Sequence, residues 1–249
     1  MVFLGSCFSA VWIVVANSWQ QTPAGYHIVG EGLRARAEVT DFWAMVFNPS
    51  SIVRLLHVWT GSFLSGAFFV LSVSAWYLLR RRFEPIARPM FKTALVVATF
   101  FSLFQLFMGD RSASLIMVIG IVIIGLTLLA CFFWWRKKLF DHRWLLWAFV
   151  PSVALPQLAN LSGWFTAGIG RQPWVVYGLL RTSDAFSKQL HANQIVFSLI
   201  LFLVAYVLLL VLFIYLLKKK IVRGPVDASL QKKYQRSPLR DNPIDTIVA

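Results

Sequence analysis

The sequence contains few charged residues: Asp, Glu, Lys and Arg make up 14% of the 249 residues, and only 10 residues are acidic. Hydrophobic residues account for 58% and aromatic residues for 16%, which excludes an ordinary soluble domain with a charged surface. The net charge of +14 would suggest nucleic-acid binding in a soluble protein. We expect no nucleic acid as a partner, because the basic residues cluster at the ends of long apolar runs, where orientation in a membrane explains them.

Cysteine and targeting signals are also scarce. Cys7 and Cys131, the two cysteines, lie in apolar runs without the paired spacing of a metal site or a disulfide framework, and are interpreted as core residues. No Lys or Arg precedes Arg34, so the first apolar run lacks the basic start of a signal peptide. Because the chain opens within a hydrophobic segment, we expect preceding helices to be missing or to belong to another chain. Neither a nucleotide-binding loop nor a nucleophile with a neighbouring base is found in the sequence.

Long apolar runs dominate what is present. A span needs about 20 apolar residues to cross a hydrocarbon core of about 30 Å. Six runs approach or exceed this length, the first being the shortest: residues 3–16, 55–77, 91–108, 115–135, 144–161 and 195–217. The expected fold class is all-α, a polytopic transmembrane helix bundle of about six spans. Residues 1–223 are predicted to form the transmembrane domain and residues 224–249, which are polar and rich in proline, a tail.

Pro151 and Pro156 interrupt the fifth run. Each lacks a backbone N–H group and predicts a kink, which is tolerated in membranes where neighbouring groups bond to the freed backbone. Such a kink is often found beside a ligand or a cavity. A transporter is therefore one hypothesis, although no inverted repeat in hydropathy supports it.

Basic residues gather in three regions that alternate with other loops. Most of the 24 Lys and Arg residues lie within residues 80–92, within residues 136–143 or after residue 217. The positive-inside rule places these three regions on the cytoplasmic side. The sequence therefore predicts a multi-pass protein of the cell inner (cytoplasmic) membrane with a cytoplasmic C-terminal tail.

His57 and Met117 are the candidate metal ligands. In the predicted orientation both of their helices enter from the outer surface, so the two side chains lie about one turn below that surface at matching depth. An imidazole and a thioether at equal depth can bind opposite faces of one haem iron, a pair that raises the reduction potential relative to two imidazoles. Two alternatives stay open: His57 can hydrogen-bond water among lipid headgroups, and Met117 can simply fill the core.

Two outer loops carry further signals. The segment NSWQQTPAG at residues 17–25 is interpreted as an interfacial anchor followed by a turn. Arg171, in the segment GRQPW, is expected to pair with an anionic group such as a carboxylate or a haem propionate. The alternative is an arginine that extends its guanidinium to water beside a Trp anchor. Histidines in polar loops need no special role, and none is assigned to His27, His142 and His191.

Several stretches together resemble subunit I of cytochrome bd-type quinol oxidases. They occur in the order typical of that family and run through most of the chain: VANSWQQTPAG at residues 15–25, NPSSIVRLLH at 48–57, GAFFVLSVSAWYLLR at 66–80, LIMVIG at 115–120, and GWFTAGIGRQPWVVYGLLRTSDA at 163–185. The resemblance implies a respiratory-chain membrane subunit that oxidises quinol at the outer face and passes electrons through haem groups to oxygen. It places His57 and Met117 on the ligand positions of a low-spin haem b, and Arg171 in a motif that lines the haem region.

The resemblance also implies partners, and the sequence departs from the family in several places. An oxidase subunit II and quinol are the implied partners, together with the lipid bilayer. The helices that hold the high-spin haem b and haem d in the family are not found, so these groups are expected only if another chain supplies those helices. GDRSAS replaces the long quinol-binding loop, Leu161 and Gly168 stand where the family usually has glutamate, and Leu115 stands where it has arginine.

These departures limit the expected function. The resemblance predicts a low-spin haem b site for electron transfer in a chain that is incomplete for oxygen reduction alone. The alternative is a haem-free membrane paralogue that scaffolds or regulates an oxidase complex.

Overall fold

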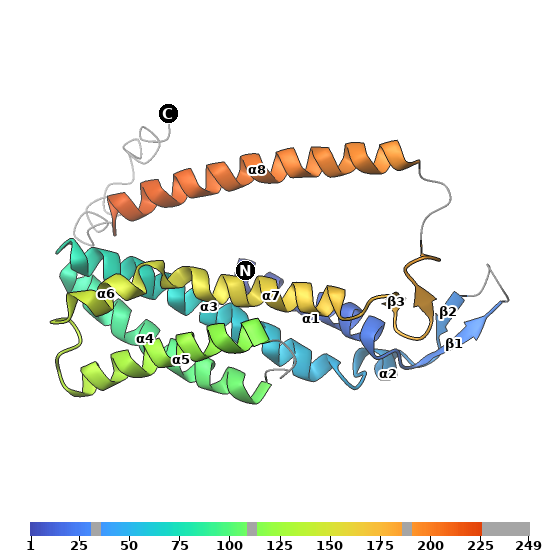
Figure 1. Cartoon of the computed structure of the whole chain (residues 1–249), viewed down its shortest axis with the longest axis horizontal. Helices are drawn as coiled ribbons and strands as arrows, with labels where there is room; N and C mark the ends of the chain where they lie inside the picture. Colours follow the sequence, from blue (N-terminus) through green and yellow to red (C-terminus); the bar gives the residue numbers. More distant parts are fainter. Residues whose placement is uncertain (31–35, 109–113, 186–190, 226–249) are drawn as a thin grey trace, which may run out of the picture. The chain divides into compact units, whose positions relative to one another are not determined.

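The structure is a computed structural model that describes residues 1–30, 36–108, 114–185 and 191–225 (Figure 1). Within these residues six helical stretches are long and apolar enough to cross a membrane. They are α1 (Val2–Gln21), α3 (Ser51–Leu79), α4 (Glu84–Met108), α5 (Ser114–Trp135), the broken pair α6 (Arg143–Phe149) and α7 (Ala154–Ile169), and α8 (Ala192–Arg223). The predicted class of a helical membrane protein with six spans is therefore confirmed. The predicted tail lies outside the described residues from residue 226 onward.

The chain divides into two compact units, Met1–Gln189 and Leu190–Ala249. In the second unit, α8 runs for 32 residues, and nearly all of its apolar side chains are exposed. Its last turn carries Lys220 and Arg223, and Gly224 ends it with a φ of 78°. A helix that is apolar all round and ends in basic residues is suited to a membrane span with its basic end at the water interface.

The core of the first unit lies between α3, α4 and α6. Phe68 of α3, Phe91 and Leu95 of α4, and Phe149 of α6 are fully buried. The Phe149 ring meets the Phe91 ring edge-on with centroids 5.1 Å apart, and the Phe68 ring lies 6.4 Å from it. Aromatic pairs of this kind add about 0.5–1.5 kcal/mol beyond the burial of their area. The cluster thus fixes the short helix α6 against the two long spans.

The fifth span is broken at Pro151, as the sequence predicts. A 3₁₀ turn, η2 (Pro151–Val153), separates α6 from α7. Proline cannot donate to the preceding turn, and at this break the Ser72 hydroxyl of α3 donates to the Val150 carbonyl oxygen at 2.6 Å. Pro156 lies in the first turn of α7, where its missing N–H group has no partner to lose, and it causes no second break.

Two short hairpins were not predicted. Strand β1 (Tyr26–Val29) pairs antiparallel with β2 (Arg36–Val39), and β3 (Trp174–Val176) pairs with β4 (Leu180–Arg181). A short helix, α2 (Phe42–Val46), follows β2. Strands of two to four residues are too short to leave a reliable alternation of apolar and polar residues in the sequence.

Most of the spanning helices are longer than the apolar runs predicted for them. A helix can continue through polar residues beyond the hydrocarbon core, as α4 does by starting at Glu84.

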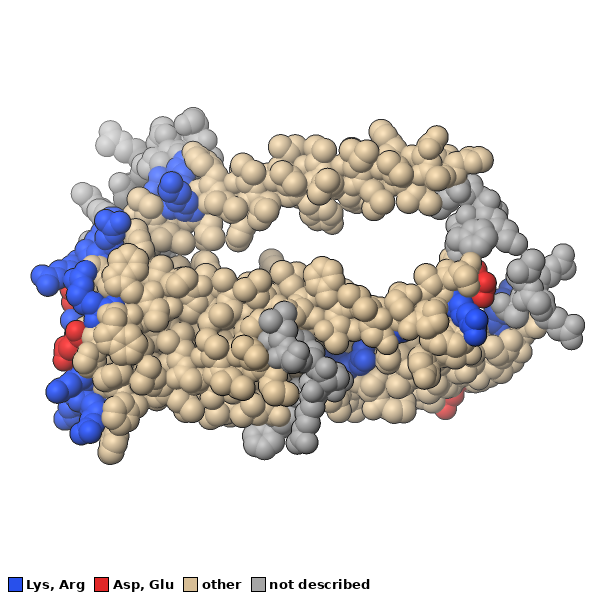
Figure 2. All heavy atoms as spheres, in the orientation of Figure 1, with Lys and Arg blue, Asp and Glu red and all other residues tan. Residues whose placement is uncertain are grey.

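Basic residues of the first unit gather at one end of it. The turns that join α3 to α4 and α5 to α6 form this end, and Figure 2 shows Lys and Arg side chains concentrated there. We call it the basic end. The two hairpins and α2 lie at the other end of this unit, away from the basic end (Figure 1). This separation is the charge asymmetry that the positive-inside rule describes.

Candidate functional site

His57 lies half-buried in the second turn of α3, and its ring contacts Gln105 of α4. The Gln105 amide nitrogen lies 2.9 Å from Nδ1 of His57 and 3.1 Å from Nε2. The amide can donate to whichever ring nitrogen carries no proton. The Gln105 Oε1 atom is buried and has no hydrogen-bond partner in the described part of the chain. The candidate ligand therefore has a polar neighbour that retains unused acceptor capacity.

Met117 lies in the first turn of α5 and is 51% exposed. Helix α5 packs against α4 and α7. About half of the residue surface is therefore exposed in this unit. His57 and Met117 thus lie on different helices, and their pairing across one haem remains a prediction.

The described residues contain no group of three or more His, Cys, Asp or Glu side chains that could hold a metal ion. This observation concerns metal ions that are bound by three or more protein side chains. A haem iron needs only two axial ligands from the protein, and one imidazole with one thioether is an established set.

Arg171 follows α7 directly and is half-buried. Its Nη1 atom donates to Oε1 of Gln20 at 2.9 Å, and the backbone carbonyl of Gln20 accepts a bond from the Tyr177 N–H at 2.9 Å. Gln20 lies in the last turn of α1, so one residue of α1 holds two points of the loop after α7. No acidic side chain among the described residues forms an ion pair with Arg171. Its positive charge therefore faces a neutral amide.

The end of α1 forms a hydrogen-bond cluster with the start of α3. Asn17 accepts a bond from Nη1 of Arg54 at 3.1 Å, and the Thr22 hydroxyl donates to Oδ1 of Asn48 at 3.0 Å. Buried Asn48 donates through Nδ2 to the buried Ser18 hydroxyl at 2.9 Å. The NSWQQTPAG segment thus has a role that its sequence did not reveal: it bonds the ends of two spans to each other.

Arg54 and Gln105 are the polar residues near His57 that were not predicted from the sequence. Arg54 precedes His57 by three residues, so the two lie on the same side of α3. The signal for Arg54 was present in the segment NPSSIVRLLH, as a cation one turn before the candidate ligand. The signal for Gln105 was weaker, since it is a single amide in the apolar segment FSLFQLFM, and only the packing of α4 on α3 gives it a neighbour.

Comparison with protein families decides the class of membrane protein to which these helices belong. The family described as cytochrome bd terminal oxidase subunit I matches residues 1–119 and 111–225. The chain belongs to this family. Membership agrees with the resemblance found in the sequence motifs and makes the chain a member of a family of membrane oxidoreductases in electron transport.

Individual relatives agree with this assignment. The chain is 26% identical to cytochrome bd ubiquinol oxidase subunit 1 of Bacillus subtilis over 316 aligned residues, which cover 90% of this chain and 67% of the relative. It is 41% identical to cytochrome bd-II ubiquinol oxidase subunit 1 of Escherichia coli over 113 residues, covering 45% of this chain and 22% of that relative. The fold is similar to that of the bd oxidase from Geobacillus thermodenitrificans, with a TM-score of 0.76, 18% identity, and coverage of 89% of this chain and 68% of that one.

The comparisons support a shortened subunit I. The alignment with the Bacillus subtilis relative is longer than the 249 residues of this chain, so the aligned region of the relative contains residues without a counterpart in this sequence. The two matched ranges of the family overlap at residues 111–119, next to the link between α4 and α5. This link is where the sequence predicts a much shorter loop than in the family.

Proposed function

We propose that this chain is a subunit I component of a cytochrome bd-type quinol:oxygen oxidoreductase and carries a low-spin haem b between His57 and Met117. The observation that carries the proposal is the position of His57. It is the only one of the four histidines that lies within a span, and the half-buried Gln105 amide contacts its ring. Membership of the cytochrome bd subunit I family supports the haem as its ligand.

The residues present fit such a group in chemistry. In the described arrangement both ring nitrogens of His57 face the Gln105 amide nitrogen. Rotation of the amide about its terminal bond would direct the unpartnered Oε1 atom at one ring N–H, which leaves the other nitrogen for iron. A ligating histidine almost always donates its second N–H in this way. The thioether of Met117 completes the donor set.

Arg54 and Arg171 are suited to the carboxylates of the haem. Each guanidinium donates to a neutral amide oxygen, Asn17 for Arg54 and Gln20 for Arg171. A guanidinium offers five N–H donors in a fixed geometry, and it binds carboxylates in preference to amides. We propose both as propionate partners.

A bound haem b supplies one-electron transfer. The chain's own part is to orient the imidazole through Gln105 and to supply a thioether, which raises the reduction potential relative to a second imidazole. Quinol is the proposed electron donor on the outer side, and the proposed partners are an oxidase subunit II and a chain with the haem groups at which oxygen is reduced. The basic end is proposed to face the cytoplasm from the inner membrane.

Pyridine haemochrome analysis of the purified full chain, with copurifying subunits identified by mass, tests the proposal. We expect b-type haem, and we expect His57→Ala to lose the low-spin spectrum. His27→Ala, which changes an exposed histidine in β1, is the matched control and should keep that spectrum. Absence of b-type haem from the wild-type protein would reject the haem site and favour the haem-free scaffold.

A further inference from the structure

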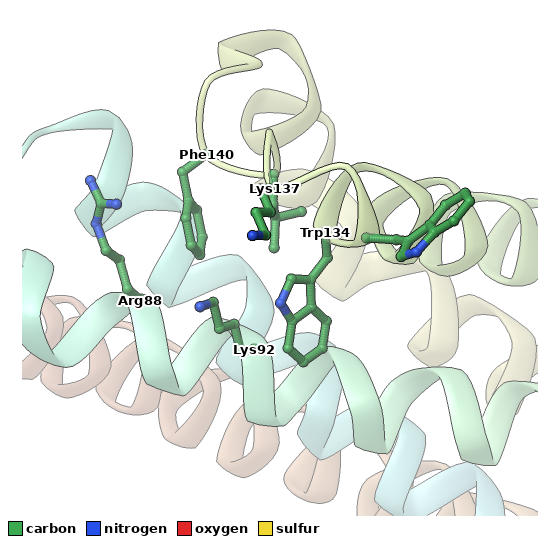
Figure 3. A pocket seen from close by; sticks show the side chains of 7 residues that line it. Arg88, Lys92, Trp134, Lys137 and Phe140 are labelled. Atoms are coloured by element: carbon green, nitrogen blue, oxygen red, sulfur yellow. The ribbon is translucent and has the colours of Figure 1, made fainter.

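A cleft of about 470 Å³ lies at the basic end, between the first half of α4 and the turn that joins α5 to α6 (Figure 3). Its lining combines cations with aromatic rings: Arg88, Lys92, Lys137, Trp134 and Phe140. Lys92 precedes Gln105 by 13 residues on α4, which corresponds to about 20 Å along the helix axis. The cleft is therefore separate from the proposed haem site.

The cleft carries positive charge that acidic side chains do not neutralise fully. Arg88 forms an ion pair with Glu84 at 2.9 Å. Neither Lys92 nor Lys137 forms an ion pair with an acidic side chain in the described residues. Figure 3 shows both ammonium groups pointing toward the space beside Phe140. Two like charges directed at one space repel each other and attract an anion.

Aromatic rings form the walls around these cations. The Lys92 ammonium lies 5.8 Å from the ring centroid of Trp134 and 5.9 Å from that of Phe140. The Arg88 guanidinium lies 5.2 Å from the centroid of the same Phe140 ring. Trp134 lies in the last turn of α5, and tryptophan at the end of a span is typical of the bilayer headgroup region. The cleft thus combines cationic side chains with an aromatic wall at the end of a predicted span.

Lys137 lies in the turn that ends α5. Its φ is 57°, and the Lys138 N–H donates to the Phe133 carbonyl oxygen at 2.9 Å, which is the hydrogen-bond pattern of a common helix C-terminal cap. Arg81 adopts the same conformation where α3 ends, with the Arg82 N–H donating to the Tyr77 carbonyl oxygen at 2.9 Å. The cap after α5 places the Lys137 side chain in the lining of the cleft.

We propose that this cleft binds the phosphate group of an anionic phospholipid headgroup. Lys92 and Lys137 bind the phosphate oxygens, and Trp134 packs beside the glycerol and the upper part of the acyl chains. The shared chemistry is a phosphate ester, which a lipid or a soluble metabolite can carry. The apolar wall and the position at the ends of the spans favour the lipid, and anionic lipids are abundant on the side where basic residues collect.

A binding experiment on the purified full chain in neutral detergent distinguishes these sources. The probes are dioctanoyl phosphatidylglycerol, dioctanoylglycerol, which lacks the phosphate, and soluble glycerol phosphate, each measured by native mass spectrometry. The double variant Lys92→Gln/Lys137→Gln is compared with Arg136→Gln/Lys138→Gln. The control pair removes the same charge, flanks Lys137 in the turn after α5 and does not line the cleft.

We expect phosphatidylglycerol to bind the wild-type chain and the first double variant to weaken its binding by about ten-fold or more. The control pair should change it by less than about two-fold. The variant Lys92→Arg/Lys137→Arg should retain binding, which separates loss of the site from loss of folding.

Three results would overturn the proposal. Equal losses in the two glutamine pairs would mean that general surface charge attracts the lipid. Equal binding of dioctanoylglycerol would show that the phosphate is not recognised. Binding of glycerol phosphate as tight as that of the lipid would assign the cleft to a soluble phosphate ester.

Discussion

At the scale of single residues, the contact between His57 and Gln105 is the most informative feature of the site. An imidazole inside a span needs a polar partner, and Gln105 supplies one from the neighbouring helix α4 at 2.9 Å. The same amide has a buried oxygen without a partner among the described residues. We expect that oxygen to accept the second N–H of a ligating His57.

Replacing Gln105 therefore changes how firmly the haem is held. We expect Gln105→Leu to lower haem affinity by about 10–100-fold, the usual cost of removing the partner of a ligating histidine, and Gln105→Glu to retain haem because a carboxylate accepts the same bond. The measurement is the ratio of haem to protein after dialysis against apomyoglobin. Gln157→Leu, which changes an exposed amide on α7, is the control. If all the variants lost haem to the same extent as the wild type, Gln105 would not contribute to haem binding.

Depth in the membrane indicates His57 and Met117 as candidate ligands because two helices enter from the same surface, and the family resemblance points to the same residues. Their role as haem ligands stays a prediction. Gln105 was out of reach, because a single amide in an apolar run gains a partner only through the packing of α4 on α3. Arg171 was predictable as a cation, whereas its contact with Gln20 joins residues 151 positions apart.

At the scale of elements, hydrogen bonds between α1 and α3 and a close approach of α3 to α7 position the site. Arg54 lies three residues and Asn48 nine residues before His57, at the end of the unit opposite the basic end. Gly61 lies four residues after His57 on α3 and faces α7.

Asn48 is the centre of the cluster between α1 and α3. Asn48→Ala leaves the buried Ser18 hydroxyl and the Thr22 hydroxyl without this amide, and we expect the free energy of unfolding to fall by about 1–3 kcal/mol. Asn193→Ala, on the exposed face of α8, should change it by less than about 0.5 kcal/mol. Thermal unfolding in detergent is the measurement. Equal stability of the two variants would show that the cluster contributes nothing.

Gly61 allows α7 to approach α3. A Cβ atom at this position would lie 2.8 Å from Oδ1 of Asn160, which donates through Nδ2 to the Ser65 hydroxyl at 3.0 Å. We expect Gly61→Ala to displace Asn160 and to lower stability by about 1 kcal/mol. At Gly66 a Cβ atom meets nothing within 4 Å, so Gly66→Ala should be neutral or slightly stabilising. Melting temperatures that change alike in both variants would contradict the close approach.

Secondary-structure elements were predictable from the sequence where the length of an apolar run or the position of a proline determines them. All six spans were expected, as was the break at Pro151, because a long apolar run and a missing N–H group each have one structural consequence. The hairpins after α1 and α7 were not expected, since their pairing depends on tertiary contacts such as the bond from the Tyr177 N–H to Gln20.

At the scale of the whole molecule, charge and motif order carry the information. The basic residues gather on alternate loops, and the motifs follow one another as in the cytochrome bd subunit I family, so orientation and family were both predicted from the sequence. The family is confirmed by the comparisons, and the orientation remains a prediction. Contacts between spans could not be predicted, because apolar faces of similar composition do not specify their neighbours.

Orientation is tested by labelling single cysteines in intact cells. With Cys7 and Cys131 changed to Ala, we expect His27→Cys to react with a maleimide that cannot cross the inner membrane, and Lys138→Cys to react only after permeabilisation. Both positions are exposed, so access to the reagent alone separates them. The opposite labelling pattern would reverse the proposed topology.

The central claim is that His57 and Met117 would be the two protein ligands of one haem iron. Potentiometric titration of the haem in Met117→His and Met117→Leu, each beside the wild-type chain, tests it most directly. We predict that Met117→His keeps a low-spin haem with a lower reduction potential, because an imidazole replaces the thioether, and that Met117→Leu loses the low-spin state. A reduction potential and spectrum unchanged in both variants would contradict the claim.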